Sequence, residues 1–566
     1  MEARTIPSLW RAAIAAERDT PAYLVERAGG WKEVSWREAA QTVEELANGL
    51  LARGIRKGDA FGIISRTRLE WTLFDFALAH VGAITAPVYP NSSPREAQYV
   101  LEHSEAGGVL VENPEQRAKV ERLGLPHVIG LDALAGLRAE GRAFAAEHPR
   151  ALAEAVAGIG GEDLYTYIYT SGTTGPPKGC MIRHRNYHAM TTCIDDIEGL
   201  GLDRDVMLLY LPLAHNFGRL MSLWGAAAGF TIAFCPDPYA VAEVLPQVRP
   251  TLLPSVPRVY EKAHTAVLSA LDNASGPRRR LADWALGVGR RVSALRQRGE
   301  RLPPALALQH RVADRLVFSK VKARFGGRLR IGISGGAPLA KEIGEFFHAL
   351  DMLILEGWGL TECTTAACVN RPLRYRFGTV GPAMPGFEVR AADDGELLIR
   401  SDTVFAGYLK DRDATAEVLG EDGWLRSGDV GEIDADGFVT ITDRKKDILV
   451  TAGGKNVAPQ NIENALKTSR LVSHALVVGD RRPYVTALVT LDPEEAVKAD
   501  GDPRALVQRT VDEVNAELSR FEQIKRFAIL PRDFSADEGE VTPTLKLKRR
   551  VVEEHFADEI ERLYAG

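Results

Sequence analysis

Short apolar runs alternate with amphipathic stretches through the first part of the chain. After Gly58 the runs AFGIIS, AITAPV and GGVLVEN predict buried strands. Between the first two runs, apolar residues at helical spacing predict a helix that includes Leu69, Leu73, Phe76 and Leu78. Strands that alternate with helices in this way are typical of a parallel α/β sheet.

Two local patterns add detail to this prediction. Ser93, Pro94 and Glu96 form a capping box, so a helix is expected to begin at Pro94. The run from Leu220 to Pro236 has 17 residues and no charge. Because it is shorter than the roughly 18 residues that suggest a membrane span, we expect it to be buried core.

The pattern changes after the charged segment DRKKD, which begins at Asp443. Short apolar strands (ILVT, HALVVG and YVTALVTL), a helix from Pro459 and a charged tail follow it. We therefore predict an α/β fold with a large N-terminal domain of mixed sheets and helices, residues 1–443. A small, mobile α+β domain is expected at residues 444–566.

Composition limits the class of protein. The 566 residues are 45% hydrophobic and 26% charged, which excludes a disordered or collagen-like chain, and a net charge of −6 argues against a nucleic-acid partner. The five cysteines form no CxxC pair, and the N-terminal apolar stretches are too short for a signal peptide. A reducing, cytoplasmic location is expected.

One segment departs from the overall charge. Residues Gly276 to Arg301 hold eight arginines and two acids, a local charge of +6, with apolar residues at helical spacing. Such a basic amphipathic helix could contact the inner face of a membrane through Arg278 to Arg301. The alternative, which we favour, is a solvated surface, because Gly287 and Gly289 weaken an isolated helix.

The richest motif is YTSGTTGPPKG, from Tyr169 to Gly179. Its small residues, hydroxyl groups and single lysine, Lys178, are suited to surround a polyphosphate. The motif is not a Walker A loop, because Pro177 stands where that loop has its second glycine, and this excludes a P-loop NTPase.

This motif resembles the signature loop of the adenylate-forming (AMP-binding) superfamily. Two further segments fit the resemblance: RIGISGGAPL, from Arg330, and LILEGWGLTE, from Leu353. The resemblance implies ATP as a co-substrate and Mg²⁺ held by Thr170 and Glu362, a ligand set that suits a hard cation. The implied nucleotide-binding residues in these segments are Thr170, Ser171, Gly172, Thr173, Thr174, Gly175, Lys178, Gly335, Gly336, Ala337, Glu356, Gly357, Trp358, Gly359 and Thr361.

The resemblance extends into the C-terminal part. Asp429, in WLRSGD, and Arg444 are the implied ribose contacts. Asp443 and Lys446 are the implied hinge, and Lys546, in VTPTLKLKRR, is the implied lysine of the adenylation step. With Lys546, the implied catalytic residues are Thr170, Lys178 and Glu362.

The long-chain fatty acyl-CoA synthetase branch is the most similar. TAGGKNVAP resembles the pantetheine-lining loop of that branch, so Gly453, Gly454 and Lys455 are expected to meet CoA, and LPLAH places His215 at the acyl site. Independently, the stretch after His215 offers no acid for an ammonium group, which favours a fatty acid over an amino acid. The chain departs from the branch at Asn216 and Gly218, where relatives usually carry an apolar residue and a glutamate.

Together these features predict a ligase that forms acyl-AMP from a long-chain fatty acid and ATP, and then transfers the acyl group to CoA. Two alternatives remain open at this point. The acceptor could be an acyl carrier protein, or the chain could be a non-catalytic nucleotide or acyl-CoA sensor on the same fold.

Overall fold

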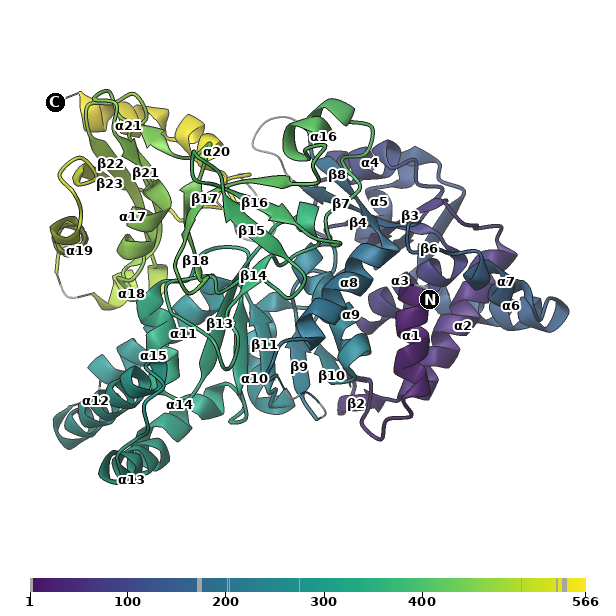
Figure 1. Ribbon diagram of the computed structural model, residues 1–566, viewed down its shortest axis with the longest axis horizontal. Coiled ribbons are helices and arrows are strands. Elements are labelled where there is room, and N and C mark those ends of the chain that lie inside the picture. The colour runs from purple at the N-terminus through teal and green to yellow at the C-terminus, as the bar shows by residue number, and fades with distance from the viewer. Residues whose placement is uncertain are drawn as a thin grey trace.

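Two large sheets form the body of the protein in the computed structural model, which describes residues 4–170, 176–200, 202, 204–273, 275–499, 501–535, 538–541 and 547–565 (Figure 1). The first sheet has the order β6-β5-β3-β4-β7-β8. Its strands are β3 (Ala60–Ile64), β4 (Ile84–Val88), β5 (Gly108–Val111), β6 (His127–Gly130), β7 (Leu164–Thr170) and β8 (Lys178–Arg183). All neighbours are parallel except β7 and β8.

The predicted elements of this sheet are confirmed. The three apolar runs form β3, β4 and β5, and α3 (Leu69–Val81) connects the first two strands. α4 (Pro94–His103) begins as expected, because the Ser93 side chain accepts from the Glu96 backbone N–H at 3.2 Å and the Glu96 carboxylate accepts from the Ser93 N–H at 2.9 Å.

The second sheet has the order β14-β13-β12-β11-β9-β10-β1-β2. Its strands are β1 (Tyr23–Arg27), β2 (Gly30–Val34), β9 (Val206–Leu209), β10 (Thr231–Phe234), β11 (Leu252–Ser255), β12 (Ile331–Ser334), β13 (Leu353–Trp358) and β14 (Cys368–Val369). The helices α8 (His184–Asp195) and α9 (Asn216–Ala228) lie between the two sheets (Figure 1). The charge-free run forms most of α9 and all of β10, and the prediction that it is core is confirmed by its burial.

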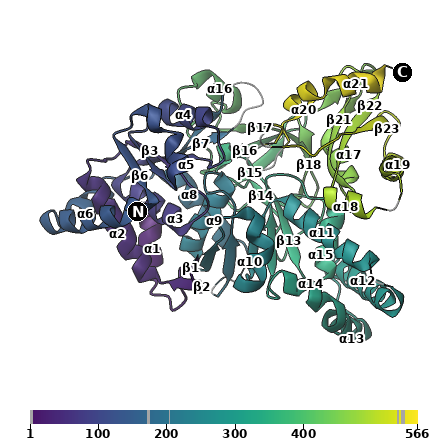
Figure 2. The same ribbon diagram turned by 180° about the vertical axis from the view of Figure 1, so that it is seen from behind.

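Other helices cover the faces and edges of these sheets. They are α1 (Ile6–Ala15), α2 (Trp36–Ala52), α5 (Pro114–Ala118), α6 (Leu134–Glu147), α7 (Ala151–Ala157), α10 (Val241–Val248), α11 (Pro257–Asp272), α12 (Gly276–Gln297), α13 (Pro304–Ala313), α14 (Ser319–Arg324), α15 (Lys341–Ala349) and α16 (Arg412–Val418). α12 and α13 extend away from the rest of the molecule, as both views show (Figures 1 and 2). No described helix is long and apolar enough to cross a membrane.

One glycine of the arginine-rich segment, Gly289, has a packing role. A Cβ atom at Gly289 would lie 2.4 Å from the backbone oxygen of Ala349, at the end of α15. Gly289 therefore permits the close approach of α12 to α15. The predicted helix is present: α12 is one continuous helix of 22 residues.

An antiparallel sheet and a small α+β part complete the fold. The antiparallel sheet comprises β15 (Glu388–Ala391), β16 (Glu396–Arg400), β17 (Leu425–Ile433) and β18 (Val439–Arg444). The C-terminal part comprises β19 (Leu449–Val450), β20 (Asn456–Val457), α17 (Pro459–Leu466), β21 (Val472–Val478), β22 (Val485–Leu491), α18 (Pro493–Lys498), α19 (Pro503–Glu517), β23 (Ile524–Ile529), α20 (Arg549–His555) and α21 (Ala557–Tyr564). Two hydrophobic clusters contain only residues from Leu449 onward, so the predicted class, a large α/β part with a smaller α+β part, is confirmed.

Candidate active site

A cavity of about 1830 Å³ lies where the strands of the two large sheets end. Thr170 ends β7, and Gly335 follows β12, so the cavity occupies the carboxyl ends of parallel strands, where open α/β sheets bind ligands. Residues of β17, β18 and α20 close its other side. The predicted site residues that line it are Thr170, Lys178, His215, Gly335, Gly336, Gly357, Trp358, Gly359, Thr361, Glu362, Asp429, Arg444 and Lys446.

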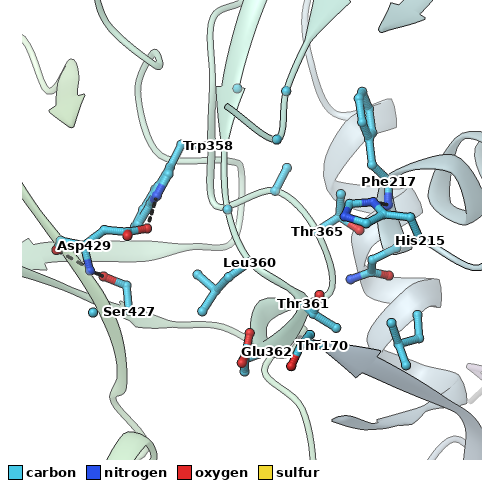
Figure 3. A pocket seen from close by; sticks show the side chains of 18 of the residues that line it. Thr170, His215, Phe217, Trp358, Leu360, Thr361, Glu362, Thr365, Ser427 and Asp429 are labelled. Carbon is cyan, nitrogen blue, oxygen red and sulfur yellow. Dashed lines mark hydrogen bonds between the residues drawn. The ribbon is translucent and has the colours of Figure 1, made fainter. Parts of the chain in front are cut away.

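Thr170 and Glu362 meet in one corner of this cavity (Figure 3). Glu362 lies in the short turn Thr361–Cys363 that follows β13. Its Oε1 accepts a hydrogen bond of 2.6 Å from the hydroxyl of Tyr408. Burial, together with the nearby Glu362 charge, holds the pKa of Tyr408 far above its usual range, so this hydroxyl keeps its proton and remains a donor.

Tyr408 also connects Glu362 with Lys178. The Lys178 ammonium lies 5.1 Å from the centre of the Tyr408 ring and 3.7 Å from the Asp411 carboxylate. An ammonium over an aromatic face is held by the ring quadrupole. Tyr408 is a site residue that the sequence analysis missed, because nothing in the local pattern of GYLK indicates a contact with residue 362.

The Thr170–Glu362 corner fits a magnesium ion. One carboxylate and one hydroxyl suit a hard cation that takes its remaining ligands from phosphates and water. Among the described residues, no group of three or more His, Cys, Asp or Glu side chains could hold a metal by itself. An ion at this corner would therefore depend on the oxygens of a bound nucleotide.

Asp429 lies at the opposite side of the cavity. Its Oδ2 accepts a hydrogen bond of 2.7 Å from the indole N–H of Trp358, and its backbone N–H donates to Ser427 Oγ at 3.0 Å (Figure 3). Arg444 is its register partner across β17 and β18, with Nε 3.4 Å from Asp429 Oδ1. The two implied ribose contacts thus lie side by side, next to Trp358, which is also an implied nucleotide-binding residue.

The glycine loop after β12 is supported from below by a buried carboxyl group. Glu356, on β13, accepts a hydrogen bond of 2.9 Å from the backbone N–H of Leu339. Burial raises its pKa to about 8, so the group is largely protonated at neutral pH. Gly335 and Gly336 line the cavity, whereas Ala337 and Glu356 do not. Glu356 therefore contacts the glycine loop on the side away from the cavity.

An apolar arm extends from the cavity along α9. His215 stands at its entrance, where it caps α9 by accepting from the Phe217 N–H at 3.2 Å. The arm is lined by Ile194, Ile197, Leu200, Leu220, Met221 and Trp224. These side chains are suited to a hydrocarbon chain.

A buried ion pair lies behind α9. Arg219 is fully buried and its Nη2 is 2.5 Å from Asp75 Oδ1. Asp75 also accepts from the hydroxyls of Tyr165 at 2.5 Å and Thr85 at 2.6 Å. The sequence pattern did not indicate this network, because Arg219 was visible only as the residue that bounds the charge-free run.

Some predicted residues lie away from the cavity. Gly453, Gly454 and Lys455 form an exposed turn between β19 and β20, with the Lys455 ammonium 5.9 Å from the Phe521 ring centre. α20 lines the cavity instead. Ser171, Gly172, Thr173, Thr174, Gly175 and Lys546 lie outside the described residues.

The two implied hinge residues differ in their surroundings. Lys446 lines the cavity, and burial lowers its pKa. Asp443 accepts from the N–H of Gln460, at the start of α17, at 3.0 Å. Burial raises the pKa of Asp443 to about 6. This carboxylate therefore joins β18 to the first helix of the C-terminal part.

Comparison with known proteins identifies the family. Residues 10–409 match the AMP-binding enzyme family, and residues 446–566 match the AMP-binding enzyme C-terminal domain. The long-chain-fatty-acid–CoA ligase FadD15 of Mycobacterium tuberculosis is 37% identical over 97% of this chain and 95% of its own length. The long-chain-fatty-acid–CoA ligase ACSBG2 of Rattus norvegicus is 29% identical over 99% and 93%.

Solved structures share the fold. The adenylation domain of a carboxylate reductase from Mycobacterium chelonae superposes with a TM-score of 0.77 at 24% identity, covering 99% of this chain and 91% of that domain. A fatty acyl CoA synthetase of Mycobacterium tuberculosis gives a TM-score of 0.64 at 22% identity, covering 98% and 99%. With the family match over most of its length, this chain belongs to the AMP-binding enzymes.

Proposed function

We propose that this protein is an AMP-forming ligase that joins a long-chain fatty acid to CoA. In the first half-reaction, a carboxylate oxygen attacks the α-phosphorus of ATP and pyrophosphate leaves, which produces acyl-AMP. In the second, the CoA thiol displaces AMP. The observation that carries the proposal is a single cavity that joins the polar residues Thr170, Glu362 and Asp429 to an apolar arm along α9.

Different residues bind different parts of the substrates in the first half-reaction. Asp429 and Arg444 would hold the ribose hydroxyls, and Gly335 and Gly336 would lie against the adenine. Mg²⁺ held by Thr170 and Glu362 would offset charge on the phosphates. Lys178 adds a positive charge beside them. Lys546, which lies outside the described residues, is assigned to the same step because VTPTLKLKRR resembles the family segment that carries this lysine.

The second half-reaction requires a different arrangement of the C-terminal part. We place the division between residues 443 and 444 and assign the hinge to Asp443 and Lys446. A rotation there would withdraw Lys546 and bring Gly453, Gly454 and Lys455 to the cavity. In the present arrangement the Arg258 guanidinium donates to the Ser473 hydroxyl at 2.7 Å, and Ser269 donates to the Glu495 carboxylate at 2.8 Å. These contacts between the two parts would break during the rotation.

The test measures AMP release from ATP and Mg²⁺ with saturated acids from acetate to stearate, with and without CoA. CoA-dependent turnover that is greatest for the long acids is expected. Acyl-AMP formation without CoA-dependent turnover would instead indicate an acyl carrier protein as acceptor. The absence of ATP–pyrophosphate exchange with every acid would contradict the proposal and favour a sensor.

The proposal also includes a peripheral membrane contact through the helices that project from the molecule. The helical projection, residues 276–324, carries five exposed large apolar side chains: Leu281, Trp284, Leu308, Val312 and Leu316. The arginines from Arg278 to Arg301 lie in the same region, and a surface that is both apolar and basic is suited to anionic lipid. Sedimentation with liposomes that contain or lack anionic lipid tests this contact. Binding that is indifferent to lipid charge would leave the projection as a solvated surface.

A further inference from the structure

A buried amide nitrogen without a hydrogen-bond partner lies at the start of the acyl arm. Asn216 is the first residue of α9, lines the cavity and is only 1% exposed. Its Oδ1 accepts a hydrogen bond from the Tyr187 hydroxyl, whereas its Nδ2 is buried and has no hydrogen-bond partner. Buried donors are nearly always paired in folded proteins, so an unpaired one beside a ligand cavity points to the ligand as its partner.

The position of Asn216 indicates which part of a ligand it would meet. α9 lines the arm with residues at helical spacing, namely Asn216 and Phe217, then Leu220 and Met221, then Trp224. At a rise of about 1.5 Å per residue, Asn216 stands roughly 6 Å before Leu220 and roughly 12 Å before Trp224. His215, the preceding residue, lines the same cavity as Thr361 and Glu362. Asn216 is therefore near the carboxyl end of a bound acyl chain.

The surroundings hold this amide in place. Tyr187 is fully buried and packs edge-on against Tyr165, with ring centres 5.6 Å apart, so the hydroxyl that fixes Asn216 Oδ1 is itself fixed. The backbone at the start of α9 is equally constrained, because a Cβ atom at Gly218 would lie 2.4 Å from the carbonyl oxygen of Pro212. Because its oxygen accepts from Tyr187, the amide is held with its buried N–H groups free to donate to a ligand.

We propose that Asn216 is a specificity-determining residue that donates a hydrogen bond to an oxygen substituent on one of the first carbons of the acyl chain. The preferred substrate is then a long-chain acid with a hydroxyl or oxo group close to its carboxylate. This inference rests on the proposed function, which it refines. A site with a buried donor discriminates against an analogue that lacks the matching oxygen, because the donor then stays unpaired.

The test compares acids of equal length that differ in this oxygen. We would measure kcat/KM for palmitate, 2-hydroxypalmitate and 3-hydroxypalmitate with the wild-type chain and with Asn216→Leu. The wild type is expected to favour one hydroxy acid by about tenfold or more. Asn216→Leu is expected to abolish or reverse that preference while activity toward palmitate persists. Tyr187→Phe, which keeps the amide but removes its anchor, is expected to reduce the preference in part.

Two outcomes would overturn the inference. One is an equal decrease in kcat/KM for all three acids in Asn216→Leu. That result would mean that the amide contacts the substrate carboxylate or stabilises the fold. The other is a wild type without preference. Calorimetric measurement of the affinity of the wild type for the three acids tests this inference independently of the proposed function. Tighter binding of one hydroxy acid than of palmitate supports the role of Asn216 even if the acids are not turned over. Equal affinities, or tighter binding of palmitate, refute it even if they are.

Discussion

The hydroxyl of Tyr408 donates a hydrogen bond of 2.6 Å to Glu362, although the two residues are 46 positions apart in the sequence. The bond occupies one carboxylate oxygen and fixes the direction in which the other points. Lys178 lies over the same tyrosine ring. Tyr408 is thus a positioning residue for the two charged groups expected beside the phosphates.

Replacing this tyrosine tests that role. Tyr408→Phe is expected to lower kcat for acyl-AMP formation by about tenfold or more, since a hydrogen bond to a charged group contributes about 1.5–3 kcal/mol and each 1.36 kcal/mol is tenfold in rate. The Mg²⁺ concentration needed for half-maximal rate should rise as well. Measurements of ATP–pyrophosphate exchange across a magnesium titration check both effects. Tyr239→Phe, at a highly exposed position, is the control. An unchanged magnesium requirement would contradict the assignment.

Glu356 makes the stability of the fold depend on pH. Its pKa is raised from 4.5 to about 8 by burial, so the folded chain holds a proton that the unfolded chain releases. The free energy of unfolding should therefore fall as the pH rises from about 4.5 to about 8, the interval in which only the folded state keeps this proton. Urea unfolding across this interval checks the slope. Glu356→Gln, which cannot ionise, should have a flatter profile, and an identical slope in this variant would exclude Glu356 as the cause.

Gly218 is required by the packing at the start of α9. Gly218→Ala would place a Cβ atom 2.4 Å from the Pro212 carbonyl oxygen, so the helix must shift. A loss of about 1–3 kcal/mol in the free energy of unfolding is expected. Gly287→Ala is the matched control, because nothing lies within 4 Å of its Cβ position on α12. That substitution should be neutral or stabilising by up to about 1 kcal/mol. Similar losses in both variants would contradict the steric explanation.

Replacing only one partner of the buried Arg219–Asp75 ion pair should lower the free energy of unfolding. Arg219→Met leaves the Asp75 carboxylate without its counter-ion, and a loss of about 3–5 kcal/mol in unfolding free energy is expected. The double variant Asp75→Asn, Arg219→Met removes the uncompensated charge and should recover part of that loss. Chemical denaturation of the wild type, the single variants Asp75→Asn and Arg219→Met, and the double variant forms a double-mutant cycle. Additive effects would show that the two side chains do not interact energetically.

Much of the local structure could be predicted because it depends on neighbouring residues. The strands β3, β4 and β5 follow from apolar runs, and the start of α4 follows from Ser93 and Glu96, which interact across three positions. The phosphate loop stays a prediction, which was possible because its small residues, hydroxyls and lysine are contiguous. Such features are encoded within a few residues, so they can be read without knowledge of the fold.

Contacts between distant segments could not be predicted. Trp358 donates to Asp429 across 71 positions, and nothing in either motif indicates that the indole N–H meets that carboxylate. The glycines of the arginine-rich segment seemed to weaken a helix, but Gly289 permits α12 to pack closely on α15. A sequence pattern shows what a residue prefers locally, whereas the partner it meets is set by how whole elements pack.

The sequence by itself determined the class of fold and the apolar character of the stretch after His215, because each depends on residue types within short segments. The tertiary structure alone decided that Thr170, Glu362 and Asp429 share one cavity with that apolar stretch. It also decided that the amide nitrogen of Asn216 is buried without a hydrogen-bond partner at the start of the arm. These properties arise because the ends of strands and the starts of helices from distant parts of the chain meet in space. A local sequence pattern does not indicate which distant segments meet.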